Sequence, residues 1–281
     1  MKFTKLHSAG NDFVLVEAED GERDWSPLAA AMCRRHFGIG ADGLLLLLPS
    51  ESAQLRMRMF NPDGSEAETC GNGLVCLVSY AVSDGLLHMQ DVNEVTVETA
   101  AGVRNARISG GKGIQVGMGT PKFGFNDIPI DRGKGKDTVD IKLMLSYPIN
   151  IKFRELALNL VSMGNPHAVH FSKQPVADFP LHQLGPMVEN LPAFPRRINF
   201  EVARVIDRGN IDARVWERGV GETLACGSGA CAIAVAARKL GYIDNKVDIE
   251  LPGGTLEVEW DGVGEVYLSS LAEIVFRGEW F

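Results

Sequence analysis

The sequence predicts an α+β protein built from two homologous domains, because one distinctive stretch occurs twice. Residues 58–73 read RMFNPDGSEAETCGNG, and residues 214–229 read RVWERGVGETLACGSG. The two stretches align without a gap and place Cys70 opposite Cys226, 156 positions later. Each copy ends in a C-G-x-G turn that leads into an apolar run, which is typical of a helix start.

Other landmarks recur in the same order at similar offsets. Residues 8–11 (SAGN) match 162–165 (SMGN), and the hairpin pattern at 95–102 matches that at 247–254. Drifting offsets are expected of a duplication followed by insertions in loops. We therefore expect two domains related by a pseudo-twofold axis. Each should be a curved, mixed, mostly antiparallel and barrel-like sheet around one central helix.

The repeat also predicts the domain limits. The first domain is expected to cover residues 1–120, with a C-terminal strand within 270–281 returning to complete it, and the second to cover 121–269. Ligands favour the interfaces between similar domains, so the active site is expected in the cleft between them.

Within the first repeat, hydrophobic period and turn residues predict the individual elements. Ser26 and Pro27 predict the N-cap and first position of a helix that ends at Gly38, and Gly85 caps the apolar helix after Cys70. A Gly- and Pro-containing stretch, 123–140, predicts a connecting loop. Strands are expected at 2–7, 13–17, 44–48, 55–60, 95–98, 103–108 and 114–118.

Composition excludes several classes of function. The net charge is −8 and no block of Lys or Arg stands out, so nucleic acid and anionic membranes are not expected as partners. The first residues lack the apolar core of a signal peptide, and no run is long enough to span a bilayer, so a cytoplasmic protein is expected. Five cysteines without a C-x-x-C pair argue against both a disulfide framework and a structural metal site.

The paired cysteines suggest a chemistry. A pseudo-twofold axis would bring Cys70 and Cys226 to one point from opposite sides, and a helix N-terminus lowers the pKa of a thiol toward neutral. Backbone N–H groups of 71–73 and 227–229 would bind a carboxylate. One thiolate could remove a proton from a carbon while the opposite thiol returns another, which inverts a stereocentre without metal or cofactor.

Other interpretations of these cysteines stay open. Two facing thiols could cycle as a redox pair, although such pairs are usually close in sequence. A Cys–His nucleophile with His167 as base would leave the second cysteine unexplained. A binding protein of the same fold could close on an amino acid without turning it over.

With these residues in place, the chain resembles the diaminopimelate epimerases, which act in lysine and peptidoglycan-precursor biosynthesis without pyridoxal phosphate. The resemblance covers nearly the whole length. The segments that carry it are HSAGNDF (7–13), GIGADG (38–43), FNPDGSEAETCGNG (60–73), SMGNPH (162–167), RRIN (196–199), WERGVGETLACGSGAC (216–231) and LPGG (251–254).

The resemblance implies the roles of individual residues. Cys70 and Cys226 would be the two bases, and His167 and Glu217 would adjust the pKa values of the thiols. LL-2,6-diaminopimelate would be converted to the meso form by a homodimer that needs no cofactor or metal. The substrate would be bound by Asn11, Asn61, Gly71, Asn72, Asn165, Asn199, Glu217, Arg218, Gly227 and Ser228.

Two points qualify these roles. A purely structural interpretation makes Asn11, Asn61 and Asn165 turn residues, and makes Glu217 and Arg218 a solvated ion pair. Some members of the family carry Gln where this chain has Gly43, and relatives on this fold racemise other amino acids. Gly43 therefore leaves open a substrate other than diaminopimelate.

Overall fold

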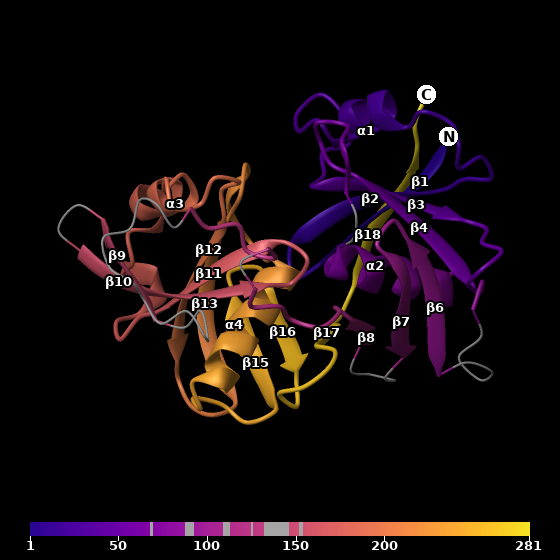
Figure 1. Ribbon diagram of the computed structural model, residues 1–281. Coiled ribbons are helices and arrows are strands. Elements are labelled where there is room, and N and C mark those ends of the chain that lie inside the picture. The colour runs from indigo at the N-terminus through magenta and orange to yellow at the C-terminus, as the bar shows by residue number, and fades with distance from the viewer. Residues whose placement is uncertain (68–69, 88–92, 109–112, 125, 132–145, 152–153) are drawn as a thin grey trace. The chain divides into compact units, whose positions relative to one another are not determined.

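The computed structural model describes residues 1–67, 70–87, 93–108, 113–124, 126–131, 146–151 and 154–281 (Figure 1). The chain divides into two compact units. The first comprises Met1–Gly117 with Ser269–Phe281, and the second comprises Met118–Leu268. Part of the predicted connecting loop, residue 125 and residues 132–140, lies outside the described residues.

The first unit is a mixed sheet with two helices. Its strand order is β18-β1-β2-β3-β4-β6-β7-β8, in which only β2–β3 and β4–β6 are parallel neighbours. The helices are α1 (Ser26–Cys33) and α2 (Gly71–Ser83). The strands are β1 (Lys2–Ser8), β2 (Asn11–Glu17), β3 (Gly43–Leu48), β4 (Leu55–Phe60), β5 (Glu66–Ala67), β6 (Glu94–Thr99), β7 (Gly102–Ile108), β8 (Ile114–Gly117) and β18 (Glu273–Glu279).

The second unit repeats this pattern. Its order is β9-β10-β11-β12-β13-β15-β16, with β11–β12 and β13–β15 as the parallel pairs. The helices are η2 (Val176–Asp178), α3 (Leu181–Glu189) and α4 (Gly227–Lys239). The strands are β9 (Tyr147–Ile151), β10 (Arg154–Ser162), β11 (Pro166–Phe171), β12 (Asn199–Val205), β13 (Asn210–Glu217), β14 (Gly221–Thr223), β15 (Lys246–Leu251), β16 (Gly254–Glu259) and β17 (Tyr267–Ser270), which reaches into the first unit.

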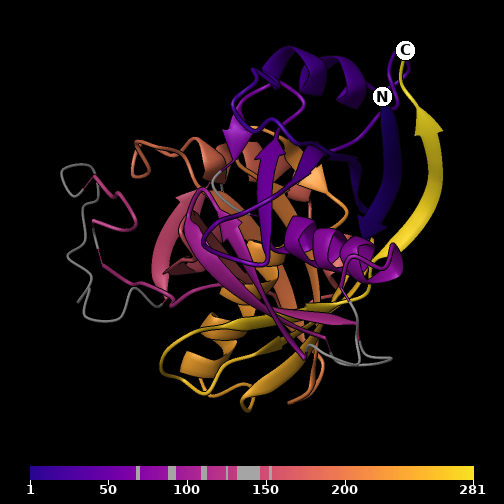
Figure 2. The same cartoon turned by 90° about the vertical axis from the view of Figure 1, so that its right-hand side faces the viewer.

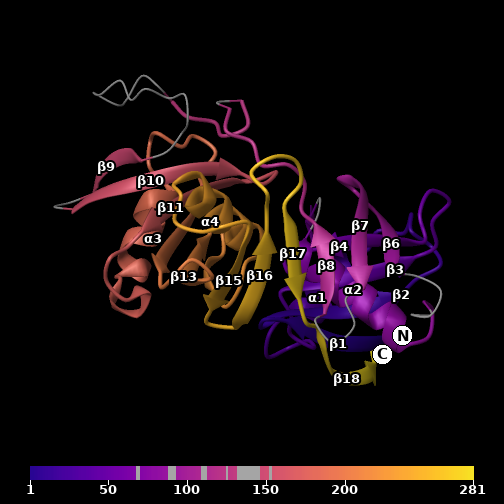
Figure 3. The same ribbon diagram turned by 90° about the horizontal axis from the view of Figure 1, so that it is seen from below.

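One long helix lies at the centre of each sheet. Ten of the 13 residues of α2 are buried, and α2 contacts β1, β2, β3, β4, β7 and β8. Ten of the 13 residues of α4 are also buried, and α4 contacts β10, β11, β12, β15 and β16 (Figure 3). The predicted α+β class, with a mostly antiparallel sheet around a central helix in each repeat, is confirmed. The pseudo-twofold relation between the units stays a prediction.

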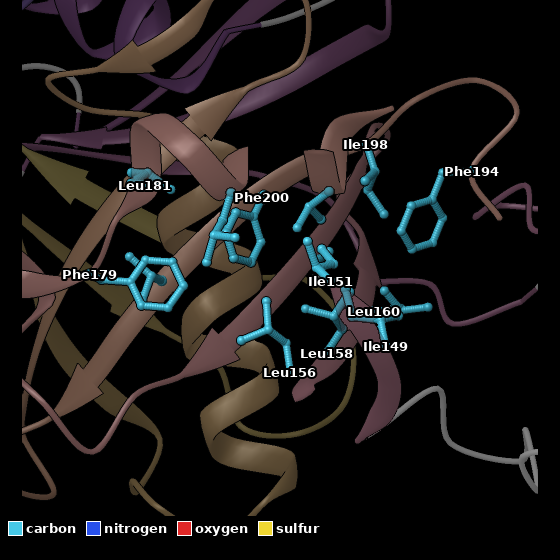
Figure 4. Close-up of a cluster of buried hydrophobic side chains, with 14 of the residues drawn as sticks. Ile149, Ile151, Leu156, Leu158, Leu160, Phe179, Leu181, Phe194, Ile198 and Phe200 are labelled. Atoms are coloured by element: carbon cyan, nitrogen blue, oxygen red, sulfur yellow. The ribbon is translucent and has the colours of Figure 1, made fainter. Parts of the chain in front are cut away.

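The other face of each sheet is covered by the shorter helix. In the second unit, Leu181, Leu184 and Val188 of α3 pack with Phe200 and Leu158 in a cluster of buried side chains (Figure 4). In the first unit, α1 covers β2 and β3 in the same way. The strand predicted at 44–48 is confirmed as β3, and every residue of it is buried, as its continuous apolar run requires.

The two ends of the chain meet within the first unit. Strand β18 runs antiparallel beside β1 from Lys2↔Glu279 to His7↔Glu273 (Figure 2). The N-terminal ammonium group donates to Trp280 O at 2.7 Å. The last strand therefore extends the first unit's sheet, because β1 would otherwise present unpaired backbone groups at an edge.

The predicted limits of the first helix are wrong at both ends. Trp25 occupies the N-cap position without a side-chain hydrogen bond, and Ser26 lies inside the helix. The helix ends at Cys33, because the N–H groups of Gly40 and Ala41 bond the carbonyls of Met32 and Cys33 at 2.9 and 3.1 Å. These bonds replace the next helical turn.

Candidate active site

The two cysteines cap the two central helices with nearly the same backbone. Cys70 has φ −146° and ψ 118° at the N-cap of α2, and Cys226 has φ −134° and ψ 112° at the N-cap of α4. The Sγ atom of Cys70 accepts from Gly73 N at 3.4 Å. Each thiol therefore lies at the positive end of a helix dipole, next to N–H groups without an intrahelical partner.

A matching ion pair supports the segment before each cysteine. Arg58 donates to Glu66 through Nε and Nη2 at 2.7 and 2.8 Å. Arg214 donates to Glu222 at 2.7 and 3.0 Å through the same atoms. Bidentate pairs of this kind fix orientation, so β5 and β14 are held against β4 and β13 where the chain approaches each helix.

In the first unit, Asn11 lies beside the start of α2. Its Nδ2 donates to Asp42 Oδ2 at 2.9 Å, and its Oδ1 accepts from Asn72 Nδ2 at 3.2 Å. The same oxygen is 4.0 Å from Cys70 Sγ. Arg35 donates to the other oxygen of Asp42 at 2.8 Å. Arg35 therefore orients the Asp42 carboxylate, and this carboxylate orients Asn11.

Asn61 occupies a turn that its own side chain helps to close. Its Nδ2 donates to Ser65 Oγ at 3.0 Å, and its backbone N–H bonds Ser65 O at 2.8 Å. Gly64 closes the turn with φ +86°. In this structure the turn-forming interpretation of Asn61 is satisfied, while its predicted contact with substrate stays a prediction.

In the second unit, the charge of Glu217 influences the Cys226 thiol. Glu217 accepts from Thr223 Oγ1 at 2.6 Å, and its charge raises the pKa of the Cys226 thiol. Desolvation raises the pKa of the Glu217 carboxyl group above its ordinary value. The role of Glu217 in adjusting the thiol stays a prediction.

Burial dominates the electrostatics of Cys226. Its side chain is 6% exposed, and burial raises the pKa of the thiol well above its usual value, with the Glu217 charge adding to the shift. Hydrogen bonds from Ser228 and from the Gly229 N–H lower the pKa but do not compensate. The expectation of a lowered pKa is wrong for this cysteine, because desolvation outweighs the helix end.

His167 reaches the start of α4 through Asn165. The Nε2 atom of His167 is 2.9 Å from Asn165 Oδ1, and Asn165 Nδ2 donates to Ser228 Oγ at 3.3 Å. The other ring nitrogen, Nδ1, is 2.6 Å from Glu201 Oε1. The structure thus joins Asn165, His167 and Ser228 by hydrogen bonds and adds Glu201, while their roles toward a substrate stay predictions.

Glu201 was missed from the sequence. It lies two residues after Asn199 in a strand that reads NFEVARV, where a single acidic residue among apolar ones is normally interpreted as facing solvent. Its side chain is instead 0% exposed. A carboxylate inside an otherwise apolar run is the signal that could have identified it.

Asn199 and Arg218 are hydrogen-bonded neighbours in the second unit. Asn199 Oδ1 accepts from Arg218 N at 2.8 Å, and Asn199 Nδ2 donates to Pro166 O at 2.9 Å. Asn165 and Arg218 line a pocket of about 310 Å³ within the second unit. Its other lining residues are Lys122, Asn126, Asp127, Pro129, Ser162, Gly164, Pro166 and Arg196.

The described residues contain no group of three or more His, Cys, Asp or Glu side chains placed to hold a metal ion. In the same part of the chain, no helix has both the length and the apolar character needed to cross a membrane.

Comparison with known proteins places the chain. A family model described as diaminopimelate epimerase matches residues 3–124 and 159–275. The chain belongs to the diaminopimelate epimerase family. It is 46% identical over 286 residues to the diaminopimelate epimerase of Moorella thermoacetica, covering 99% of both chains. It is 44% identical over 285 residues to that of Acetivibrio thermocellus, covering 99% of this chain and 98% of the relative.

Solved structures show that the diaminopimelate epimerase family shares its fold with others. A Bacillus anthracis phenazine biosynthesis protein of the PhzF family superposes with a TM-score of 0.72 at 18% identity, covering 100% of this chain and 99% of its own. A hydroxyproline epimerase from Agrobacterium vitis gives 0.69 at 15% identity, covering 99% and 91%. These likenesses confirm the fold class.

Proposed function

We propose that this member of the diaminopimelate epimerase family interconverts LL- and meso-2,6-diaminopimelate, with Cys70 and Cys226 as the two bases. The observation that carries the proposal is the matched pair of helix caps. Each repeat begins its central helix with a cysteine of the same backbone conformation, behind the same Arg–Glu bridge. Membership of the family supports the substrate.

The proposed reaction needs both units to close on one substrate, with a thiol on each face of the α-carbon. A thiolate takes the α-proton and becomes a thiol, while the opposite thiol protonates the other face and becomes a thiolate. The N-termini of α2 and α4, through Gly71, Asn72, Gly227 and Ser228, would stabilise the charge that develops on the substrate carboxylate. No step requires a cofactor.

The protonation of Cys226 bears on which cysteine acts as the acid and which as the base. Burial and the Glu217 charge favour the neutral thiol at Cys226. A thiol is the acid of the pair, so a neutral Cys226 would donate in a turnover in which Cys70 abstracts. In the reverse direction the two roles exchange, since each turnover moves one proton from one sulfur to the other.

The pocket lined by Asn165 and Arg218 supports recognition of an amino-acid head group. Arg218, Arg196 and Lys122 supply cationic donors for a carboxylate, and Asp127 supplies an acceptor for an ammonium group. Asn165 lines the same pocket and also contacts Ser228 at the helix start. A diamino-dicarboxylate would therefore find partners at both of its ends.

The decisive experiment is solvent deuterium exchange across a panel of amino acids that includes both diaminopimelate isomers. The proposed enzyme incorporates deuterium at the α-carbon of diaminopimelate. Exchange into another amino acid alone would favour a racemase of that amino acid. A redox protein or a pure binding protein would incorporate none.

We further propose that the protein acts in the cytoplasm as a homodimer, in lysine and peptidoglycan-precursor biosynthesis. The exposed apolar residues Ile274, Val275 and Phe276 of β18 support self-association, being 39%, 56% and 46% exposed. Light scattering of the full chain, with Phe276→Ser as the comparison, tests the dimer.

A further inference from the structure

The position of Glu201 has a counterpart in the first unit. In the parallel pair β2–β3, Phe13 is the partner of Gly43, and in β11–β12, His167 is the partner of Asn199. Leu45 lies two residues after Gly43 in β3, and Glu201 lies two residues after Asn199 in β12. Leu45 and Glu201 are separated by the same 156 positions as the two cysteines. Phe13 and Leu45 thus correspond to His167 and Glu201.

The surroundings of the two side chains confirm this correspondence. A Cβ built on Gly73 of α2 would lie 3.1 Å from Leu45 Cδ2, and one built on Gly229 of α4 would lie 3.1 Å from Glu201 Oε1. Leu45 and Glu201 therefore lie beneath the same turn of the two central helices, next to the capping cysteine.

The fold has an apolar solution at these positions. Phe13, Leu45, His167 and Glu201 are all completely buried. Burying a carboxylate is unfavourable unless it is fully paired, and the Oε2 atom of Glu201 has no hydrogen-bond partner. Because the first unit packs Phe and Leu in the same place, the His–Glu pair is not required for packing.

Four contacts lead from Glu201 to the Cys226 sulfur. Glu201 Oε1 holds His167 Nδ1 at 2.6 Å, which turns Nε2 toward Asn165 Oδ1 at 2.9 Å. Since that oxygen can only accept, Nε2 carries a proton and donates it. The Asn165 amide then donates to Ser228 Oγ at 3.3 Å.

The last contact ends the series at the thiol. Ser228 Oγ is 3.5 Å from Cys226 Sγ. Because Ser228 already accepts from Asn165, its own hydroxyl hydrogen is available to the sulfur. The ring orientation set at Glu201 thus reaches Ser228 through Asn165, and a hydrogen bond donated by Ser228 to Cys226 favours the thiolate.

We propose that Glu201 is a positioning residue for Cys226. Glu201 acts through His167, Asn165 and Ser228 to keep a hydrogen-bond donor directed at the Cys226 sulfur. The inference rests on the proposed function, in that Cys226 must pass between thiol and thiolate during turnover. Glu201 touches neither the substrate nor the sulfur in this account.

A purely electrostatic role predicts the opposite sign. The groups that face Cys226 are Glu217 of β13, Glu201 of β12, and Ser228 and the Gly229 N–H of α4, with His167 of β11 behind Asn165. The negative charge of Glu201 raises the pKa of Cys226. Removal of that charge alone would lower this pKa, whereas loss of the Ser228 donor would raise it.

The test compares Glu201→Leu with Glu201→Gln. In the leucine variant, Nδ1 of His167 would face an apolar side chain. A flip of the imidazole ring that turns a C–H toward the leucine is then favoured, and this flip moves Nε2–H away from Asn165. We expect kcat near neutral pH to fall about tenfold, the size of one hydrogen bond to a charged group, with KM changed less than about twofold. The loss should shrink as the pH rises. The glutamine amide offers Nδ1 both an acceptor and a donor, so this variant should retain kcat within about threefold.

A double variant separates positioning from packing. His167→Phe with Glu201→Leu installs the pair found in the first unit, so it should fold. If Glu201 acts through His167, adding Glu201→Leu to His167→Phe should change kcat less than about twofold. Equal losses in both backgrounds, or a Gln variant as damaged as the Leu variant, would overturn the proposal.

A readout without turnover keeps this inference distinct from the proposed function. The rate at which iodoacetamide alkylates Cys226, followed by peptide mapping, reports thiolate formation in the absence of substrate. Glu201→Leu should move this pH dependence upward. A downward shift or no shift overturns the positioning role even if wild-type exchange is normal, and absence of wild-type exchange would overturn only the function.

Discussion

The charge of Glu217 acts on the thiol of Cys226 and raises its pKa. Glu217 occupies the position that Asn61 holds in the first unit, so the repeat places an acid beside one cysteine and an amide in the equivalent turn. The two thiols, although matched in backbone, therefore have different electrostatic surroundings within their own units.

Glu217→Gln should make Cys226 a stronger acid. After burial, the Glu217 charge is the largest cause that raises the pKa of Cys226, and glutamine removes that charge while still accepting from Thr223. We expect Cys226 to be alkylated faster at a given pH, by about tenfold for each unit of pKa change. Asp212→Asn, a change of charge on the same strand, should leave the rate unaltered.

Replacing either capping cysteine by serine should cut turnover by about 10² to 10⁴, the usual contribution of a general acid or base. Cys33→Ser is the matched control. Cys33 is buried at the end of α1, and burial raises the pKa of its thiol to about 12, so it is no acid–base group near neutral pH. Epimerisation assays on the three purified variants test this. Equal damage from Cys33→Ser would contradict the assignment.

The repeat, the central helices and the buried strand β3 were predictable because each has a strong local pattern. The run GLLLLL needs burial on both faces, and C-G-x-G before an apolar run starts a helix. Glu201 was not predictable in this way. Its strand alternates as if one face met solvent, and only the tertiary packing of β12 against α4 shows that this face is buried.

The predictions of the Cys226 pKa and of the end of α1 were wrong for related reasons. A helix N-terminus acts locally and can be inferred from sequence, whereas desolvation depends on all surrounding elements. The end of α1 depends on Gly40 and Ala41 returning to the last carbonyls. Gly38 also packs tightly there, since a Cβ would lie 2.2 Å from Ala31 O. Both effects arise from residues outside the element concerned.

Mild oxidation should inactivate the enzyme by joining Cys70 to Cys226. The proposed reaction requires both sulfurs to reach one carbon. The two sulfurs are then close enough to each other to form a disulfide after small movements. Cys76 is the internal alternative, but six residues along a helix separate its Cα from that of Cys70 by about 9 Å. Peptide mapping after oxidation identifies the pair. A link from Cys70 to Cys76 would contradict the two-base arrangement.

Asp12→Asn should destabilise the first unit in a pH-dependent way. Lys5, which is 7% exposed, donates to Asp12 and to Gly40 O, and Arg35 donates to Asp12 at 2.7 Å. Burial of Asp12 raises its pKa, but the hydrogen bonds and charges of Arg35 and Lys5 outweigh burial and lower it below 3.8. Asparagine leaves the Lys5 ammonium group without its counter-ion, which should cost about 2 kcal/mol at pH 7.

The sign of the pH effect follows from the lowered pKa. A carboxyl group whose folded pKa is depressed stabilises the protein above its unfolded pKa, and this stabilisation disappears as the pH falls through the folded value. The gap in urea midpoint between wild type and Asp12→Asn should therefore be full at pH 7 and should narrow below pH 4. Glu19→Gln, which removes an exposed carboxylate, should show no gap. A gap for Asp12→Asn that is independent of pH would mean that the side chain contributes shape rather than charge.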